Sequence, residues 1–568
     1  MYYQNKSTLR RTAMKYEEVL VELKNFLYKG RKSVRNSDLA IQNKFIFHSK
    51  LDEVAFESEI DWNYKHPHSH NTYQLYMHTL NIVGNLTASY LDTNDENYIE
   101  KAHSIIISWV NTEDNQYIAN INSSWKDHSV SSRIKNLILY QLSAPESLKM
   151  SKAVFNAQLK SHGDFLSDRK NYSENNHGMM SDEALLLLSY FMDDEKIGDR
   201  FKELAVLRME RMVYKLFSSM SMNLENSPEY HKVTQVLSAK FIDLTKIIGV
   251  DFDSRCKEII IKSEYINSLI IQPDKTYPLI GDTGYRKLKI NKVYDNLIDY
   301  QAGLAIINTR TEAEADSSWL SFKSGYVSTS HKHLDDLSIN YVHNGESILV
   351  DSGKYNYDGR DPMKQYMKSP SAHSTIFLKD GEYSLNNAVD DAKCMRLKFV
   401  QETKEYVHLA GINHLYDKMK IWRDIIYFES RGMIIIDRYI TDSSKVMSQN
   451  FNYHEKLNIN KIDGKSYMIQ TPKGKELIIK EMTARTISRY YSHENKERGF
   501  ISRDFGKYIE TQQIEYLKKS YKNQYITLLY EPELMNIDGI EEKEGLLNFI
   551  VDGKEISVRL QRTDNYTD

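Results

Sequence analysis

The residues best suited to chemistry lie close together in the second half of the chain. His331 and His333 are followed by Asp351 and then by His373. If residues 328–338 form a strand, side chains two positions apart point to the same face. His333, Asp351 and His373 are the nitrogen and oxygen ligands of a typical metal site, which leaves His331 as an imidazole beside the ion. A hydrogen-bonded histidine cluster without metal is the alternative.

A polar segment in the first half interrupts a regular helical pattern. Asn176 and His177 precede Ser181, which is a suitable N-cap residue. We therefore expect Asn176 and His177 in the loop that leads into a helix, where amide and imidazole groups can bind an anion. A capping loop without function is the competing interpretation.

A second polar segment runs from Glu225 and Asn226 to Tyr230. Pro228 is suited to the first position of a helix, so Tyr230 is predicted to lie in the first turn. The helix dipole at that end would help to stabilise a phenolate. The simpler interpretation is that Tyr230 is a half-buried packing residue.

Arg133 follows Trp125 and His128 closely in the sequence. It is a candidate contact for a substrate carboxylate, because a guanidinium group binds carboxylates through two parallel hydrogen bonds. A structural salt bridge is an equally good interpretation.

The elements that must position these residues change character along the chain. From about residue 14 to about residue 300, apolar residues recur at helical spacing, which indicates an array of helical hairpins, either a solenoid or a closed toroid. After Tyr300 the period becomes that of strands, with hairpin-type dipeptides such as Asn344-Gly345 between them. We therefore expect an antiparallel β-sandwich to the C-terminus, and two domains, 1–300 and 301–568, with a cleft between them.

Composition narrows the class of protein. The chain has 568 residues, too many for one core, and 41% apolar with 27% charged residues is ordinary for a soluble protein. The formal net charge of −3 gives no basic field for nucleic acid. There are 40 tyrosines against 19 phenylalanines. Tyrosine suits sugar-binding clefts, although compositional drift explains this bias as well.

Cellular location is predicted from the first residues and from the apolar runs. Residues 1–11 lack an apolar segment after their basic residues, and no apolar run is long enough to span a bilayer. The two cysteines, Cys256 and Cys394, are in neither a disulfide pattern nor a metal-type spacing. We expect a cytoplasmic protein.

These motifs, in this order, resemble the heparinase II/III-like polysaccharide lyases, a family that includes heparan- and alginate-degrading members. The resemblance covers most of the chain and is carried by the segments 175–178, 225–231, 331–338, 351–353 and 372–374. It implies an α+β multidomain protein, with an incomplete (α/α) toroid followed by an antiparallel β-sandwich. Many members are exported, so a periplasmic or exported protein is the alternative to a cytoplasmic one.

The resemblance also implies β-elimination at a uronic acid and assigns roles to residues. Tyr230 and His331 resemble the acid/base pair, and Asn176 and His177 the groups that neutralise the substrate carboxylate. Arg133, Glu225 and Asn226 are candidate substrate contacts. The partner would be an acidic, uronate-containing polysaccharide.

The family further implies one divalent metal, in most members Zn²⁺, with a mainly structural role. His333, Asp351 and His373 match its ligands. Ser374 stands where many members have asparagine, which affects the support of His373. Two other functions stay open: a catalytically silent glycan-binding or polysaccharide-assembly protein on the same fold, and a metal-dependent glycan hydrolase.

Overall fold

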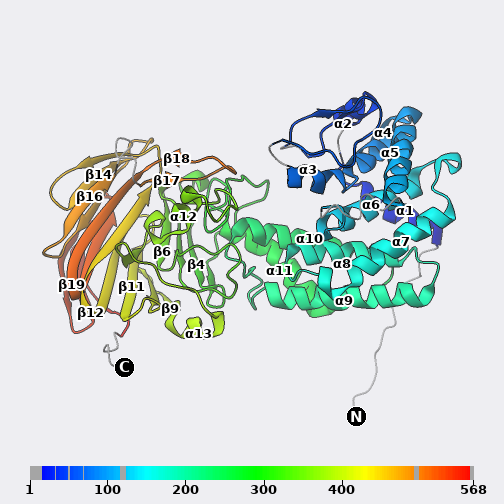
Figure 1. Ribbon diagram of the computed structural model, residues 1–568. Coiled ribbons are helices and arrows are strands. Elements are labelled where there is room, and N and C mark those ends of the chain that lie inside the picture. Colours follow the sequence, from blue (N-terminus) through cyan, green and yellow to red (C-terminus); the bar gives the residue numbers. More distant parts are fainter. Residues whose placement is uncertain are drawn as a thin grey trace, which may run out of the picture. The chain divides into compact units, whose positions relative to one another are not determined.

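The computed structural model describes residues 16–31, 34–48, 51–67, 70–114, 123–491 and 498–562. They form two compact units (Figure 1). Unit 1 comprises Met1–Lys215 and Thr234–Ile260, and unit 2 comprises Leu216–Val233 and Ile261–Asp568. Within the described ranges, no helix is both long and apolar enough to cross a membrane. Residues 1–15, on which the predicted location rests, lie outside these ranges, so that location stays a prediction.

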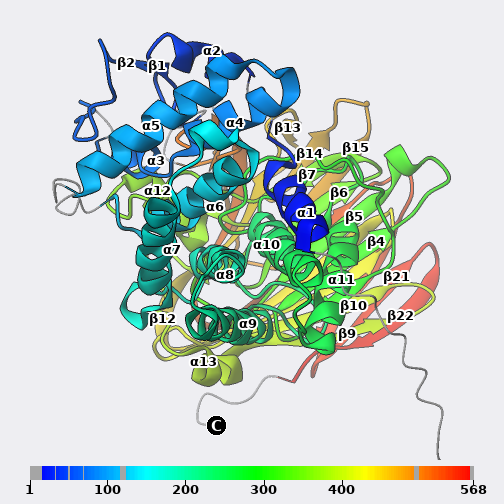
Figure 2. The same cartoon turned by 90° about the vertical axis from the view of Figure 1, so that its right-hand side faces the viewer.

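Unit 1 is mainly helical, which confirms the predicted secondary structure. In α1 (Tyr16–Tyr28) the buried residues are Val19, Leu23 and Leu27, spaced four apart on one face. The other helices are α2 (Val34–Ile41), α3 (His70–Met77), α4 (Asn81–Thr93), α5 (Glu96–Asp114), α6 (Asp127–Ser143), α7 (Lys152–Ser167), α8 (Asn176–Ser189), α9 (Glu195–Leu216), most of α10 (Pro228–Ile247) and the start of α11 (Ser254–Ile270). Helix α4 packs against α5 and α6, and α6 packs against α7 and α8 (Figure 2). The incomplete (α/α) toroid stays a prediction.

Unit 2 is rich in antiparallel strands, as predicted. The main path of its large sheet runs in the order β13-β14-β15-β19-β12-β7-β6-β5-β4-β3, and β9, β10 and β11 join it through β12. Its strands are β3 (Leu297–Asp299), β4 (Leu304–Thr309), β5 (Ser318–Lys323), β6 (Ser338–His343), β7 (Glu346–Leu349), β8 (Ile376–Leu378), β9 (Met395–Glu402), β10 (Val407–Asn413), β11 (Met419–Phe428), β12 (Gly432–Tyr453), β13 (Asn458–Lys461), β14 (Ser466–Gln470), β15 (Glu476–Glu481), β16 (Ile487–Tyr491) and β19 (Gln512–Tyr530). The smaller sheets are β17 (Phe500–Ile501) with β18 (Ile509–Glu510), and β20 (Ile537–Lys543) with β21 (Leu546–Val551) and β22 (Lys554–Arg559).

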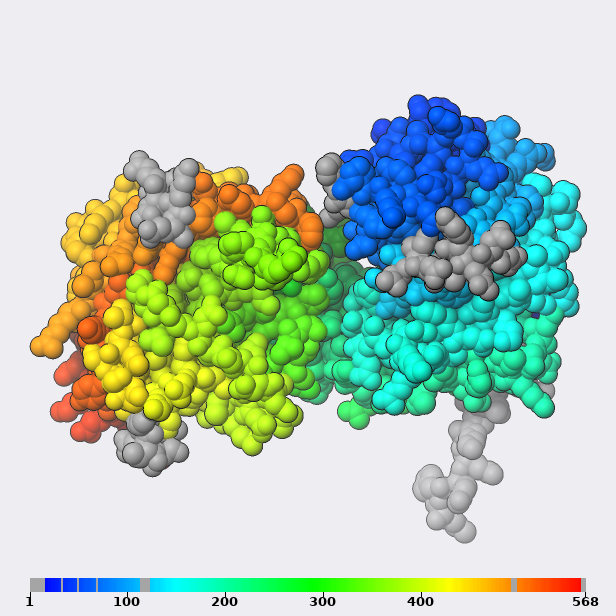
Figure 3. Space-filling model, in the orientation of Figure 1, coloured from blue at the N-terminus to red at the C-terminus, as the bar shows by residue number. Residues whose placement is uncertain are grey.

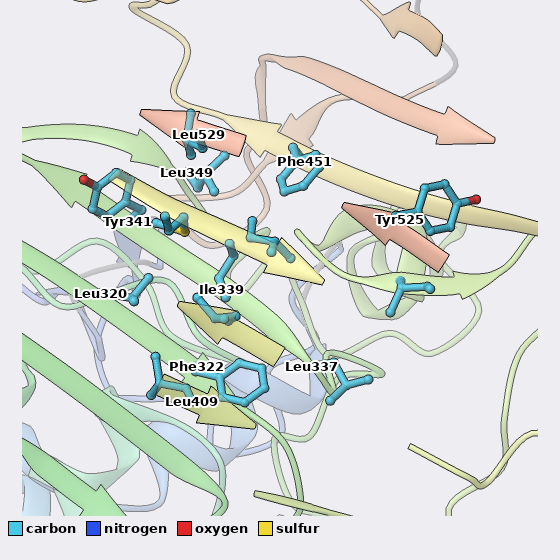
Figure 4. Close-up of a cluster of buried hydrophobic side chains, with 14 of the residues drawn as sticks. Leu320, Phe322, Leu337, Ile339, Tyr341, Leu349, Leu409, Phe451, Tyr525 and Leu529 are labelled. Carbon is cyan, nitrogen blue, oxygen red and sulfur yellow. The ribbon is translucent and has the colours of Figure 1, made fainter. Parts of the chain in front are cut away.

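Strand β12 lies between two apolar cores of unit 2. Met433 and Ile435 belong to the larger core, which Figure 4 shows around Phe322, and Ile434 and Ile436 belong to a second core shared with β21 and β22. Because successive side chains of a strand point to opposite faces, both faces of this segment are buried. This explains why residues 433–436 are apolar without alternation.

The helical region ends earlier than the periodicity predicts. Helix α11 ends at Ile270 and β3 begins at Leu297, and residues 271–296 contain neither helix nor strand. The predicted hairpin at Asn344-Gly345 is confirmed, because it joins the paired strands β6 and β7 and both residues have positive φ angles. The segment 271–296 contains Asp282, whose contacts are described next.

Candidate active site

Tyr230 lies in the first turn of α10, as the sequence predicts. Pro228 is the first residue of the helix, where its missing N–H removes no helical hydrogen bond. The backbone N–H of Tyr230 donates to Ser227 Oγ (3.4 Å), which lies 2.7 Å from Thr283 Oγ1. Burial raises the pKa of Tyr230, although a hydrogen bond with Tyr357 opposes this rise. At neutral pH the phenol therefore keeps its proton and can donate it.

The ring of His331 stacks on the ring of Tyr230, with centroids 3.5 Å apart and planes inclined by 17°. The predicted strand around His331 is wrong, because the residue lies in the loop between β5 and β6 with a φ of 56°. Asn226 holds this loop, since its side-chain amide donates to the carbonyls of Ser328 (2.6 Å) and Ser330 (3.1 Å). A turn, rather than strand alternation, therefore brings the imidazole to Tyr230.

Asp282 connects both histidines of the loop, and sequence reasoning missed it. Its Oδ2 lies 3.2 Å from His331 Nδ1, its Oδ1 lies 3.1 Å from His333 Nε2, and Lys364 Nζ donates to the same Oδ1. Burial alone would raise the pKa of this carboxyl, but its hydrogen bonds with the two histidines hold it well below its usual range. Asp282 is thus ionised and sets the orientation of His331. The sequence signal that could have indicated Asp282 is its position between Gly281 and Gly284.

Gly281 allows the two active-site loops to approach each other closely. A Cβ atom at this position would lie 2.4 Å from the carbonyl oxygen of Asn226 and 2.7 Å from that of His331. Its φ of 56° also favours glycine. The juxtaposition of Tyr230 and His331 therefore depends on a residue without a side chain.

Tyr357 is a second residue that the sequence motifs did not indicate. Its hydroxyl oxygen lies 2.7 Å from that of Tyr230. Lys354 lies near both phenol rings, with Nζ 5.9 Å from the centroid of Tyr230 and 6.0 Å from that of Tyr357. Glu229 binds Lys354 Nζ at 3.0 Å. Tyr230 is thus next to both a hydroxyl donor and a cation.

The predicted metal ligands are close together but hydrogen bonded in pairs. His373 Nδ1 lies 2.5 Å from Asp351 Oδ1, whereas His333 is bonded to Asp282, and the two imidazole centroids are 5.5 Å apart. His373 Nε2 is buried without a hydrogen-bond partner. Over the described ranges, no group of three or more histidine, cysteine or acidic side chains is arranged to hold a metal ion. This geometry does not support the three-ligand site, so the zinc ion stays a prediction.

Asn176 and His177 lie together in unit 1, at the start of α8. The prediction that the helix begins at Ser181 is wrong, because Asn175 is the N-cap and its side chain accepts a hydrogen bond from the N–H of His177 (2.8 Å). His177 Nδ1 lies 3.3 Å from Asp127 Oδ1, and this hydrogen bond raises the pKa of His177. Its side chain is 45% exposed. The imidazole therefore carries a positive charge more readily than usual and remains accessible to an anion.

Arg133 lies in the core of unit 1 and is fully buried. Its guanidinium carbon is 4.4 Å from the ring centroid of Trp109 and 5.1 Å from that of Trp125. Nε donates to His162 Nε2 at 2.9 Å, and one terminal nitrogen donates to two backbone carbonyls. These contacts favour a structural role for Arg133 over the predicted substrate contact. Its partner is the imidazole of His162 rather than the carboxylate of a salt bridge.

Glu225 and Asn226 are also poorly placed for the predicted substrate contact. Their exposed fractions are 3% and 7%. The side chain of Asn226 is used to hold the loop that carries His331. We therefore interpret this pair as part of the support of the site rather than as its surface.

Comparisons with known proteins place the chain in a family. The model of the heparinase II/III N-terminus matches residues 1–303, and the model of the heparinase II/III-like C-terminal domain matches residues 300–533. The chain belongs to the heparinase II/III family, which confirms the family predicted from the motifs.

Individual relatives are distant in sequence. A heparin-sulfate lyase of Bacteroides stercoris is 20% identical over 478 residues, covering 75% of this chain and 70% of the relative. One from Bacteroides thetaiotaomicron is 21% identical over 458 residues, covering 71% and 64%. The crystal structure of a heparan sulfate lyase from Pedobacter heparinus has a TM-score of 0.70 at 16% identity, covering 96% of this chain and 94% of that one. This last similarity concerns the fold.

Proposed function

We propose that this protein is a polysaccharide lyase that cleaves a uronate-containing glycan by β-elimination. The observation that carries the proposal is the stacking of His331 on Tyr230 at 3.5 Å, in a chain of the heparinase II/III family. Relatives named heparin-sulfate lyases support a substrate of the heparan type as the first to test.

In the proposed reaction His331 is the base. Its Nδ1 is bonded to Asp282 at 3.2 Å, which favours the tautomer with a proton on Nδ1 and a free lone pair on Nε2. Nε2 takes the C5 proton of the uronate, the C5–H electron pair forms the C4=C5 double bond, and the C4–O bond breaks. The buried carboxylate of Asp282 stabilises the imidazolium that forms.

Tyr230 is the proposed acid. Its raised pKa keeps the hydroxyl protonated until the leaving oxygen of the C4–O bond takes the proton. The adjacent hydroxyl of Tyr357 and the cation of Lys354 then stabilise the developing phenolate. For some uronate epimers Tyr230 is also the base, as the family resemblance implies.

Removal of the C5 proton requires the neighbouring carboxylate to be neutralised, because a second negative charge develops beside it. We propose that Asn176 and His177 do this. Support comes from the exposure of His177 and from Asp127, which raises the pKa of His177 and so favours the cation. The predicted zinc ion has no part in these steps.

A panel of heparan-type, alginate-type and other uronate polymers tests this function through the ultraviolet absorbance of the unsaturated product. Tyr230→Phe and His331→Ala are expected to lower kcat by about 10²–10⁴-fold, the range for loss of one acid or base. Tyr521→Phe is the control, because it removes a phenol hydroxyl from a residue that is 64% exposed and lies on β19, outside this pair. Activity that survives both substitutions contradicts the assignment. Glycan binding without product favours a silent binding protein, and saturated products that contain added water favour a hydrolase.

A further inference from the structure

The loops beside Tyr230 carry exposed aromatic side chains, of which the proposed reaction uses only the hydroxyl of Tyr357. Tyr357, Phe505 and Tyr508 are 55%, 48% and 48% exposed. With Tyr355, these rings form two contacting pairs, with centroids 5.7 Å apart for Tyr357 and Phe505 and 6.1 Å apart for Tyr355 and Tyr508. We call Tyr355, Tyr357, Phe505 and Tyr508 the aromatic surface.

This surface is built from two segments that are far apart in sequence but bonded to each other. The N–H of Ser502 donates to the carbonyl of Ser352 at 2.7 Å, and the N–H of Gly506 donates to that of Tyr355 at 2.7 Å. Ser502 Oγ donates to the carbonyl of Lys354 at 2.6 Å. Figure 3 shows these segments, lime and orange, side by side on unit 2. The rings are therefore held in place before any ligand arrives, which lowers the entropic cost of binding.

The aromatic surface is continuous with the candidate active site. Tyr357 belongs to both, since its hydroxyl lies 2.7 Å from that of Tyr230 while more than half of the residue is exposed. The cation of Lys354 lies 6.0 Å from the ring centroid of Tyr357, on the side shared with Tyr230. A glycan whose uronate contacts Tyr230 would extend over neighbouring protein surface.

We propose that the aromatic surface is a sugar-binding subsite for the acidic glycan, in which Phe505 stacks against the apolar face of a pyranose ring and Tyr357, whose plane is inclined by 47°, lies beside it. The inference rests on the proposed function. Exposed aromatic rings are a rigid, flat and partly apolar platform, which suits the C–H face of a sugar. The continuity of this surface with Tyr230, through Tyr357, favours the glycan that the proposed site would bind. Lys354 is ion paired with Glu229 at 3.0 Å and can share its ammonium group with a glycan carboxylate.

Substitution of Phe505 tests the subsite, because its ring contacts that of Tyr357 but carries no hydroxyl that could take part in the reaction. With the uronate polymer cleaved best by the wild type, Phe505→Ala is expected to raise KM about tenfold, equivalent to about 1.4 kcal/mol. We expect kcat to change by less than about twofold, because stacking acts on substrate and transition state alike. Phe505→Tyr should restore KM, whereas Phe505→Leu, which is apolar but not flat, should not.

Tyr521→Ala is the matched control, since Tyr521 is 64% exposed and lies on β19, outside the aromatic surface. The subsite is contradicted if Phe505→Ala leaves KM unchanged, if it lowers kcat alone, or if Phe505→Leu behaves like the wild type. Tyr508→Ala, with the same expected rise in KM, replaces Phe505→Ala if that variant loses its cooperative thermal transition.

Affinity electrophoresis in gels containing each uronate polymer separates this proposal from the proposed function. If the wild type yields no unsaturated product, the lyase assignment fails, but retardation of the protein still reports binding. Weaker retardation of Phe505→Ala than of Tyr521→Ala then supports the subsite. Equal retardation of the two variants overturns it.

Discussion

Removal of the Tyr357 hydroxyl tests how the acid is tuned. In the ground state Tyr357 and Tyr230 share a hydrogen bond between neutral hydroxyls at 2.7 Å. As Tyr230 gives up its proton, the same bond is made to an oxygen that gains negative charge. A neutral hydrogen bond contributes about 0.5–1.5 kcal/mol and one to a charged group about 1.5–3 kcal/mol. The difference, about 1–1.5 kcal/mol, is what the transition state gains.

Tyr357→Phe is therefore expected to lower kcat by about tenfold, since 1.36 kcal/mol corresponds to a factor of ten. The ring and its contact with Phe505 remain, so KM should change little. The pH profile gives a second readout. The hydrogen bond with Tyr357 lowers the pKa of Tyr230, so its loss raises that pKa further. Because Tyr230 acts in its protonated form, the alkaline limb of the kcat profile should move to higher pH.

The assay is the initial rate of unsaturated product formation across the pH range, with Tyr521→Phe as control. The reasoning is refuted if Tyr357→Phe keeps kcat within about twofold of the wild type, or if its alkaline limb moves to lower pH. A double-mutant cycle adds a stricter test. Since both hydroxyls act through one proton, the losses of Tyr230→Phe and Tyr357→Phe should not add.

Asp282→Asn should lower the free energy of unfolding by about 3–5 kcal/mol, because it leaves the buried ammonium of Lys364 without its carboxylate; urea unfolding measures this loss. The folded-state pKa of Asp282 is depressed, so its carboxylate contributes to the free energy of unfolding above the unfolded pKa of about 3.9. This contribution is lost as the pH falls, and the stabilities of wild type and variant should therefore converge in acid. Gly281→Ala should abolish detectable turnover while the helical circular dichroism of unit 1 persists, because its Cβ would meet two carbonyl oxygens at 2.4 and 2.7 Å; wild-type turnover would contradict the loop geometry. Arg133→Lys should lower the melting temperature without a specific rise in KM, since a compact ammonium group cannot reproduce the contacts of the stacked guanidinium group. A rise in KM at unchanged stability would instead support the predicted role of Arg133 as a substrate contact. The predicted zinc ion is tested by metal analysis and by melting with and without chelator. Stoichiometric zinc whose removal lowers the melting temperature would support the site, with His373 Nε2, which has no hydrogen-bond partner, as an available ligand atom.

Much of the local structure was predictable, because it follows from short-range rules. Helical spacing up to α11 and strand alternation from β3 onward are properties of adjacent residues. Tyr230 was placed correctly in a first helical turn because Pro228 marks that position. The motifs also indicated the family, which the matches to residues 1–303 and 300–533 confirm.

The errors in the site have one physical cause. The sequence places the start of α8 at Ser181, but the helix begins at Asn176. The side chain of Asn175 caps it by accepting a hydrogen bond from the N–H of His177. The strand expected at His331 is a turn, because Asn226 supplies hydrogen bonds from more than a hundred residues away. Both outcomes depend on competing hydrogen-bond partners, which spacing does not reveal.

The sequence by itself determined the order of elements, the family and the pair Tyr230 and His331 as candidates for acid and base. Only the tertiary structure decided what surrounds them: Asp282 on the imidazole, Tyr357 on the phenol, and Arg133 inside a core instead of at a surface. The reason is that secondary structure depends on neighbours along the chain, whereas pKa values and orientations depend on neighbours in space. Residues 230, 282, 331 and 357 become neighbours only when loops without a period of their own fold against each other.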